Sequence, residues 1–248
     1  MRENRSEIMQ LDANGMDFSE LNKKIKETEA AKITITNCLG QRYVGNGLKD
    51  KELLIEGTPG NALGAYLDGG VIRVKGNVQE ATGDTMNHGE IYVHGSSGDI
   101  TGYAMRGGGI FIQGDVGYRA GIHMKAYEDH VPVLVIGGKA GSFLGEYQAG
   151  GIIAVLGLGC DDGQIVGNFC GTGMHGGKIF LRTRSISSHI SAEVVSRKAD
   201  NGDWSELKPC LLAFCREFAL DIKSFAQEDF WVLEPNTKNP YKKLYVHN

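Results

Sequence analysis

The segment with the most familiar chemical pattern is 171–176, which reads Gly-Thr-Gly-Met-His-Gly and fits the G-x-G-x-x-G pattern of dinucleotide-binding turns. That pattern binds phosphate only when a strand precedes it and a helix follows it, because the phosphate meets the N-terminus of the helix. Here an alternating apolar segment, 178–182, comes next and predicts a strand. We therefore interpret these glycines as structural.

Other chemically active side chains are scattered along the chain. The seven histidines form neither H-x-x-x-H nor H-E-x-x-H, and no G-x-S-x-G or Walker sequence occurs. The five cysteines contain no C-x-x-C pair, so we expect reduced, buried thiols and neither an iron–sulfur cluster nor structural zinc. Asp84, Asp99 and Asp115 are too far apart for paired acid and base chemistry. The sequence thus predicts no catalytic, cofactor-binding or metal-binding residue on this chain.

Some residues remain as candidates for an interface with another protein. Arg119 interrupts a column of small or apolar residues, so an inward-facing column would require an anion from Glu146, Asp99 or a partner, unless Arg119 turns to the surface. His123 is predicted to stand in a wall of stacked side chains with Tyr66, Thr85, Ala104, Tyr147 and Phe169. The candidate interface residues are Arg119, His123, Lys125, Tyr127, Glu128, Asp129, His130 and Glu146.

A glycine repeat must position these candidates. The chain has 36 glycines among 248 residues, about twice the ordinary usage of ~7%. One series stands at steps of 19 residues and continues less regularly through Gly145 and Gly167; a second follows it at an offset of 12. The regular members are Gly45, Gly64, Gly83, Gly102 and Gly121 in the first series and Gly57, Gly76, Gly95 and Gly114 in the second. A fixed period of this length indicates a solenoid.

Apolar pairs lie four and two residues before each glycine of the second series, beginning with Leu53 and Ile55 and including Val133 and Val135. Such alternation predicts one short strand per coil with one buried face. An interior column is expected three residues after the first-series glycines, at Leu67, Met86, Met105, Met124, Gln148 and Cys170. The sequence predicts an all-β protein, a right-handed parallel β-helix of about seven coils over residues 38–183.

A left-handed hexapeptide helix is the competing fold, since a sub-period of six also occurs. That fold needs three equal sixes per coil with an aliphatic residue at each edge. This coil divides into six, six and seven and carries its aliphatic pair on one side, which favours the right-handed form.

The open ends of a β-helix need covers. Residues 1–37 are predicted to form an N-terminal cap, with a capping box at 17–20 and a helix to about Glu29. Residues 184–248 are predicted to form a C-terminal cap, with a helix from Pro209 to Leu220 and an extended tail whose Trp231 and segment 241–245 pack on the body or bind a partner subunit. The fourth coil takes 16 residues between Gly121 and Gly137, so 125–130 must bulge outward, where binding residues often lie.

The charge of the chain limits its partners. The 26 basic and 30 acidic residues leave a net charge near −4, which argues against nucleic acid and anionic membranes. No stretch approaches the ~18 apolar residues of a membrane span, and the first residues lack the apolar core of a signal peptide. We expect a cytoplasmic protein.

Several motifs give the chain a family resemblance. They are Tyr-Val-Gly-Asn-Gly-Leu at 43–48, Gly-Asp-Val-Gly at 114–117, Gly-Glu-Tyr at 145–147 followed by two glycines, and Gly-Met-His-Gly-Gly at 173–177. With them the chain resembles the G-x-G-x-G domain family over about residues 38–183. That family includes the C-terminal domain of the glutamate synthase large subunit and one of the subunits of formylmethanofuran dehydrogenase.

The resemblance implies a right-handed β-helix that supplies spacing and interfaces rather than catalytic groups. It implies a separate, non-catalytic subunit that bridges a glutaminase-type amidotransferase chain and an FMN-dependent synthase chain, with FMN and iron–sulfur clusters on those partners. Self-association is compatible with the same sequence. The alternatives are the corresponding component of a formylmethanofuran dehydrogenase complex, and a stand-alone carbohydrate-binding module or enzyme.

Overall fold

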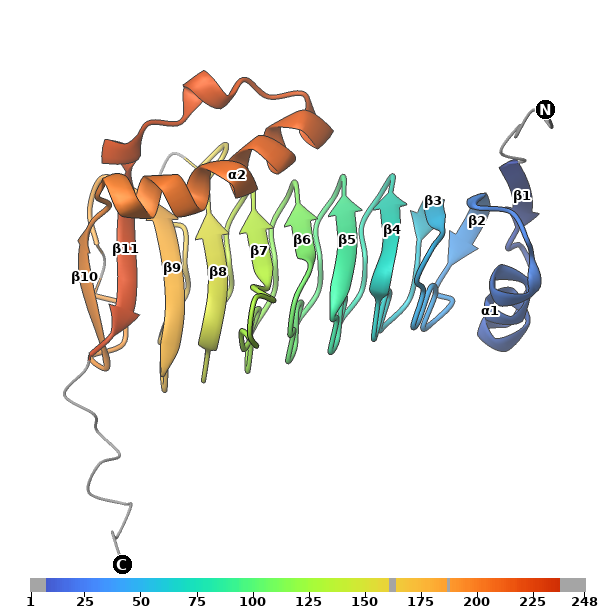
Figure 1. Cartoon of the computed structure of the whole chain (residues 1–248), viewed down its shortest axis with the longest axis horizontal. Coiled ribbons are helices and arrows are strands. Elements are labelled where there is room, and N and C mark those ends of the chain that lie inside the picture. The colour runs from blue at the N-terminus through green and yellow to red at the C-terminus, as the bar shows by residue number, and fades with distance from the viewer. Residues whose placement is uncertain (1–7, 161–163, 187, 237–248) are drawn as a thin grey trace, which may run out of the picture.

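The computed structural model describes residues 8–160, 164–186 and 188–236, and these form an elongated, right-handed parallel β-helix of about seven turns (Figure 1). Each turn adds one strand to a single sheet, and successive strands pair in parallel. The predicted fold class is confirmed. These strands are β2 (Lys32–Leu39), β3 (Glu52–Thr58), β4 (Asp68–Val74), β5 (His88–Val93), β6 (Gly109–Ile112), β7 (Val133–Ile136), β8 (Ala149–Val155) and β9 (Gly176–Arg182).

The interior is built from columns of like side chains, because equivalent residues of successive strands are paired. Ile72 pairs with Ile91 and Ile91 pairs with Ile110, and all three side chains are fully buried. Burial of each such side chain contributes roughly 1.5–3 kcal/mol. The glycine series lies against these columns: at Gly83, with φ of +70°, a Cβ would stand 2.2 Å from the Ile110 Cδ1.

The insertion after Gly121 shifts the register of the following strand. Val133 and Val135 are predicted to face the interior, but Leu134 and Ile136 take those places in β7. Since side chains alternate along a strand, a slip of one residue turns both valines to the outer face of the sheet. The prediction for this coil is wrong by one residue, because the length of the bulge could not be counted from the glycines alone.

A second slip occurs in the last turn. The Gly171 N–H donates to the Leu144 oxygen at 2.8 Å, so Gly171, and not Gly167, continues the first glycine series. Met174 therefore occupies the interior column where Cys170 is predicted. Both side chains are nonetheless buried, since Cys170 falls in a neighbouring interior column.

The N-terminal cap contains the predicted helix. Asp17 accepts hydrogen bonds from the first turn of α1 (Phe18–Glu27), and the apolar side chains of Leu21 and Ile25 are buried against the first coil. The Lys51 ammonium group donates to the Ile25 oxygen at 2.8 Å and so satisfies a carbonyl at the end of the helix. The helix ends two residues before the predicted limit.

A strand also precedes this helix. β1 (Ile8–Asp12) pairs in parallel with β2, so that α1 forms the connection between two neighbouring strands of the sheet (Figure 1). The sequence predicts a cap over residues 1–37 but no strand before its helix. One sheet thus continues through all three parts, 1–37, 38–183 and 184–248, and their boundaries stay a prediction.

The C-terminal cap is an antiparallel extension of the sheet with a helix above it. Strand β11 (Phe230–Pro235) lies between β9 and β10 (Val194–Lys198) and is antiparallel to both, so Trp231 is part of the sheet. The segment 241–245 lies outside the described residues. The helix begins at Asn201 and not at the predicted Pro209, which stands inside it. The elements of this cap are β10 (Val194–Lys198), α2 (Asn201–Phe218), η1 (Ile222–Ser224), η2 (Gln227–Asp229) and β11 (Phe230–Pro235).

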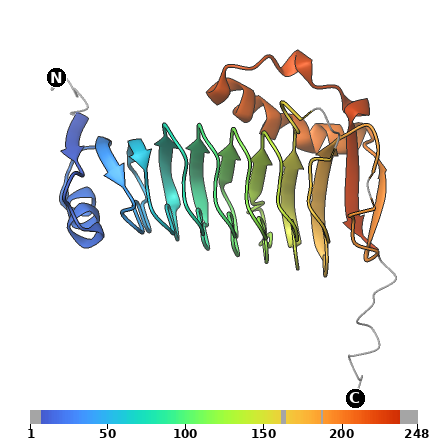
Figure 2. The ribbon, with the colours of Figure 1, turned by 180° about the vertical axis from the view of Figure 1, so that it is seen from behind.

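Helix α2 covers the outer face of the C-terminal half of the sheet, as both views of the ribbon show (Figures 1 and 2). A second apolar core lies between them, where Phe180 and Val135 from the strands meet Leu211 and Phe214 from the helix. All four side chains are fully buried. Within the described residues, neither helix combines the length and the apolar composition needed to cross a membrane.

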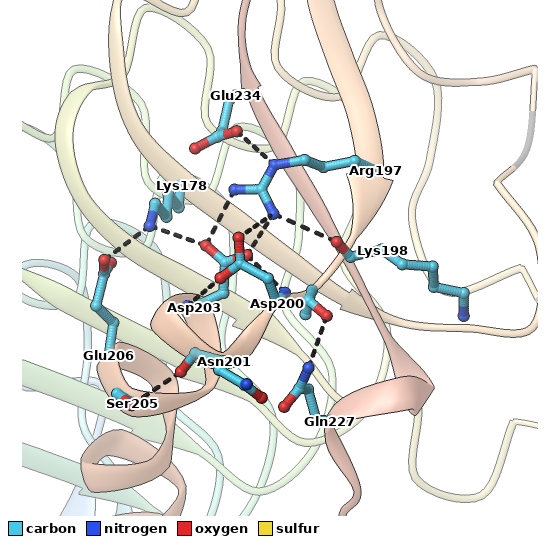
Figure 3. Close-up of polar contacts among 11 residues, drawn as sticks. Lys178, Arg197, Lys198, Asp200, Asn201, Asp203, Ser205, Glu206, Gln227 and Glu234 are labelled. Carbon is cyan, nitrogen blue, oxygen red and sulfur yellow. Dashed lines mark hydrogen bonds and ion pairs between the residues drawn. The ribbon is translucent and has the colours of Figure 1, made fainter.

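Ion pairs hold α2 at both of its ends. At the N-terminal end the Asp203 carboxylate, 2% exposed, contacts Lys178 at 2.9 Å and the Arg197 guanidinium (Figure 3). At the C-terminal end the Glu217 carboxylate lies 3.0 Å from both Arg73 Nε and His94 Nε2. The helix is therefore tied to strands from β4 to β10.

Candidate functional site

The structure brings Arg119 and Glu146 together, as one of the predicted alternatives requires. The Arg119 Nε lies 2.6 Å from a Glu146 carboxylate oxygen; the Glu146 side chain is 8% exposed and that of Arg119 39% exposed. The guanidinium also lies over the rings of Tyr118 and Phe143, at 4.6 and 5.2 Å from their centroids. The hydrogen bond to Glu146 raises the pKa of Arg119. Arg119 is thus a fixed, half-exposed cation, while the Asp99 carboxylate accepts from the backbone N–H of Tyr118 at 2.7 Å.

His123 stands in a stack of rings, and its backbone explains its position. Arg119 and His123 both adopt positive φ, 57° and 58°, on either side of Gly121 in the same turn. The ring of His123 is stacked on that of Tyr147, with centroids 5.3 Å apart and planes 13° apart, and meets Tyr103 edge-on at 6.0 Å. The predicted wall is confirmed at Tyr147.

Phe169 belongs to a different column from the one predicted. Because Gly171 continues the glycine series, Phe169 takes the place that Arg119 has two turns earlier. Its ring packs on Phe143 at 4.9 Å, and Phe143 packs on Tyr118 at 5.3 Å.

Together these rings form a surface that the sequence predicted only in part. We call it the turn strip, and it consists of Tyr103, Tyr118, Arg119, His123, Phe143, Tyr147 and Phe169. Its two stacks adjoin, since Arg119 lies over Tyr118 and Phe143 of one stack and pairs with Glu146, the neighbour in sequence of Tyr147 in the other. Phe169 is 55% exposed and Tyr147 40% exposed. The sequence signal for this strip is an aromatic residue beside the same glycine in successive turns.

The bulge at 125–130 is confirmed as an outward loop. Two backbone hydrogen bonds between Tyr127 and His130, 3.0 and 2.9 Å long, close it. Glu128 adopts φ of +52° at its tip, and the side chains of Tyr127, Glu128 and Asp129 are exposed. Neither carboxylate of the loop forms an ion pair or a side-chain hydrogen bond within the described ranges, so the structure does not join the loop's acids to the turn strip.

The loop folds back over earlier turns and forms one wall of an open cavity. The ring of His130 meets that of His88 edge-on, with centroids 4.4 Å apart. A cavity of about 540 Å³ lies beneath, lined by Asp68, His88, Arg106, Lys125, Tyr127 and His130. His88 and Arg106 are missing from the predicted site. The step of 19 from position 68 through 87 and 106 to 125 could have located Arg106, whereas His88 lies one residue after that column.

The thiols of this chain are structural. Burial raises the pKa of Cys170 to about 12 and the pKa values of Cys38 and Cys210 to about 11, which suppresses the reactive thiolate at neutral pH. Among residues 8–160, 164–186 and 188–236, no three His, Cys, Asp or Glu side chains are grouped to hold a metal ion.

Comparison with known proteins assigns the chain to a family. The GXGXG motif family model matches residues 7–235, so the chain belongs to that family, which is found in the C-terminal region of the glutamate synthase alpha subunit. An uncharacterized protein of Methanocaldococcus jannaschii is 47% identical over 249 residues, covering 95% of each chain. The match extends beyond the predicted 38–183 and includes β1 and both caps.

Proposed function

We propose that this member of the GXGXG motif family is a non-catalytic β-helix subunit of a glutamate-synthase-like oxidoreductase complex. In this role it bridges a glutaminase-type amidotransferase chain and an FMN-dependent synthase chain in the cytoplasm. The observation that carries the proposal is the family match over residues 7–235, which spans nearly the whole described body. FMN and the iron–sulfur clusters belong to the partner chains.

The turn strip supports a docking role. Aromatic residues and arginine dominate the binding energy of protein interfaces when rigid surroundings hold them in place. Here the rings stand on successive turns of the β-helix, and Arg119 is oriented by the buried carboxylate of Glu146. A surface that is already ordered loses little conformational freedom on binding. We assign the first partner contact to this strip.

Co-purification from the native host tests the proposal. A tagged full-length chain is expected to bring down a glutaminase-type chain and a yellow chain with flavin absorbance. Co-purification with molybdenum or tungsten chains would instead support the formylmethanofuran dehydrogenase alternative. Micromolar binding of oligosaccharides by the isolated chain would support the carbohydrate-binding alternative, and either result would overturn the proposal.

Variants then test the turn strip. The double variant Phe143→Ser with Phe169→Ser is expected to weaken partner binding about 30-fold or more, since truncating an interface aromatic costs about 1–2 kcal/mol or more. Leu212→Ser is the matched control, because Leu212 is also exposed, at 43%, but lies on α2. Equal binding by the double variant and the control would place the contact elsewhere.

A further inference from the structure

The cavity beneath the 125–130 loop is built on one column of the repeat. Asp68, Asn87, Arg106 and Lys125 occupy equivalent positions in four successive turns. The N–H of Arg106 donates to the turn before it at 2.8 Å, and that of Lys125 does the same at 3.0 Å. Neighbouring residues of the column are therefore separated by about one strand spacing, ~4.8 Å.

The acidic residue of this column forms an ion pair, whereas its two basic residues form none among the described residues. The Asp68 carboxylate lies 3.2 Å from Lys49 Nζ and is neutralised by it. The Arg106 guanidinium donates to the backbone oxygen of His123 at 3.1 Å, which leaves its positive charge uncompensated. The Lys125 ammonium group has no hydrogen bond or ion pair with any residue that the structure describes. Two adjacent cations thus line the cavity without an ion-pair partner among the described residues, while the Asp68 carboxylate, which also lines it, is paired with Lys49.

The walls of the cavity are fixed by packing. At Gly107 a Cβ would stand 2.2 Å from the Asn87 oxygen, so the close approach of these two turns requires glycine, and a Cβ there would also lie 3.3 Å from the Cβ of His130 in the loop. The edge-on contact of His88 and His130 joins the loop to an earlier turn. The two cations therefore stand on adjacent turns of the coil, with Lys125 at the start of the loop and Arg106 one turn before it.

We propose that this cavity binds a small dianionic oxyanion, a phosphate group or a dicarboxylate, through Arg106 and Lys125. The planar guanidinium pairs with two oxygens of one anion, and the ammonium group supplies a second point charge. The volume of about 540 Å³ lies within the range of small-molecule sites. Neither the family match nor the proposed bridging role assigns a ligand to these residues.

Titration of the isolated full-length chain tests this inference. Inorganic phosphate and succinate are titrated separately by calorimetry at constant ionic strength, with sodium chloride as the balancing salt. We expect saturable, one-to-one binding of at least one of the two anions. The anion that saturates shows whether the cavity takes a phosphate group or a dicarboxylate. Chloride at the same ionic strength should give no saturable signal.

Variants connect the binding to the two cations. Arg106→Gln and Lys125→Ala are each expected to weaken binding about tenfold, the loss of one charge-assisted hydrogen bond, and the double variant should not bind. Lys208→Ala removes one exposed positive charge on α2 and is the matched control. Circular dichroism verifies that each variant is folded. Unchanged affinity in the double variant, or no saturation by either anion, would overturn the inference and would leave the bridging role untouched.

Discussion

Replacement of Asp203 by asparagine should loosen the C-terminal cap while leaving the β-helix intact. The Asp203 carboxylate accepts from Lys178 at 2.9 Å, from an Arg197 nitrogen at 3.1 Å and from the Asp200 N–H at 2.9 Å (Figure 3). These contacts join the first turn of α2 to β9 and β10. Asparagine keeps the shape of the side chain but removes the charge that two cations share.

The size of the effect follows from burial. Removing one member of a buried ion pair costs about 3–5 kcal/mol. The Asp203 side chain is 2% exposed, but Arg197 is 39% exposed and Lys178 22% exposed, so solvent compensates part of the lost charge. We therefore expect Asp203→Asn to lower the free energy of cap unfolding by about 2–3 kcal/mol at pH 7.

The two tryptophans of the chain provide the assay. Both lie in this cap, Trp204 on α2 and Trp231 on β11, so intrinsic fluorescence reports its unfolding in urea. Far-ultraviolet circular dichroism follows the β-helix in parallel. The fluorescence transition should move to lower urea in the variant, ahead of the main dichroism transition.

The pH dependence gives an independent test of the charge. Burial raises the pKa of Asp203, but hydrogen bonds from Arg197, the Asp200 N–H and Lys178 outweigh it and hold the pKa well below its usual range. The stabilisation is therefore fully present above the unfolded pKa of about 3.9 and is lost as the pH falls through the folded value. The difference between variant and wild type should shrink below about pH 4.

Glu206→Gln is the control, since Glu206 also contacts Lys178, at 2.7 Å, but is 50% exposed. Its loss should cost at most about 0.5–1 kcal/mol. An Asp203→Asn variant whose fluorescence transition matches that of Glu206→Gln, or whose deficit stays constant down to pH 3, would show that the charge network does not hold the cap.

Three further outcomes follow from the packing. Gly83→Ala places a Cβ 2.2 Å from an isoleucine methyl group at φ of +70° and should cost about 2–4 kcal/mol in urea unfolding, whereas Gly40→Ala, at φ of +79° in open space, should cost about 1–2 kcal/mol. Glu217→Gln should release the C-terminal end of α2 at a cost of about 1–2 kcal/mol, measured by fluorescence at pH 7. Burial raises the pKa of Glu217, but hydrogen bonds from His94 and Arg73 lower it overall. The cost of the substitution should therefore become smaller as the pH is lowered. In peptide mapping after iodoacetamide treatment at pH 8, half-buried Cys160 should be alkylated before Cys170, whose burial raises its pKa to about 12.

The regular part of the fold could be predicted because close packing requires glycine at the repeat positions. A side chain at Gly83 or Gly64 would collide with an interior isoleucine, so the period of the glycines is the period of the coil. The start of α1 is equally accessible, since Asp17 caps it through local hydrogen bonds. The start of α2 differs from its prediction because Pro209 resembles a helix start, although Asp200 and Asp203 form a capping box earlier in the chain.

The site could be predicted less completely because its geometry depends on contacts between turns. A column position specifies which residues stack, but not whether a side chain leans inward or outward. Arg119 could be paired with Glu146 only as one of several alternatives, and Phe169 changes column because the last turn is longer than the repeat. The pairing of His88 with His130 requires the path of the loop, which no periodic pattern gives.

The arrangement of the caps also explains why the turn strip is left uncovered. Helix α2 covers the outer face of the sheet from its C-terminal end, and Glu217 and Asp203 tie it there at both ends. The interior is filled by the isoleucine and methionine columns, and α1 packs at the N-terminal end. The turns that carry Arg119 therefore stay open, and they present a rigid row of aromatic rings that intramolecular packing does not require. A surface of this kind is expected where a subunit is selected for contact with other chains, and substitutions of its exposed rings, such as Phe169 and Tyr147, should alter assembly while leaving the stability of the isolated chain nearly unchanged.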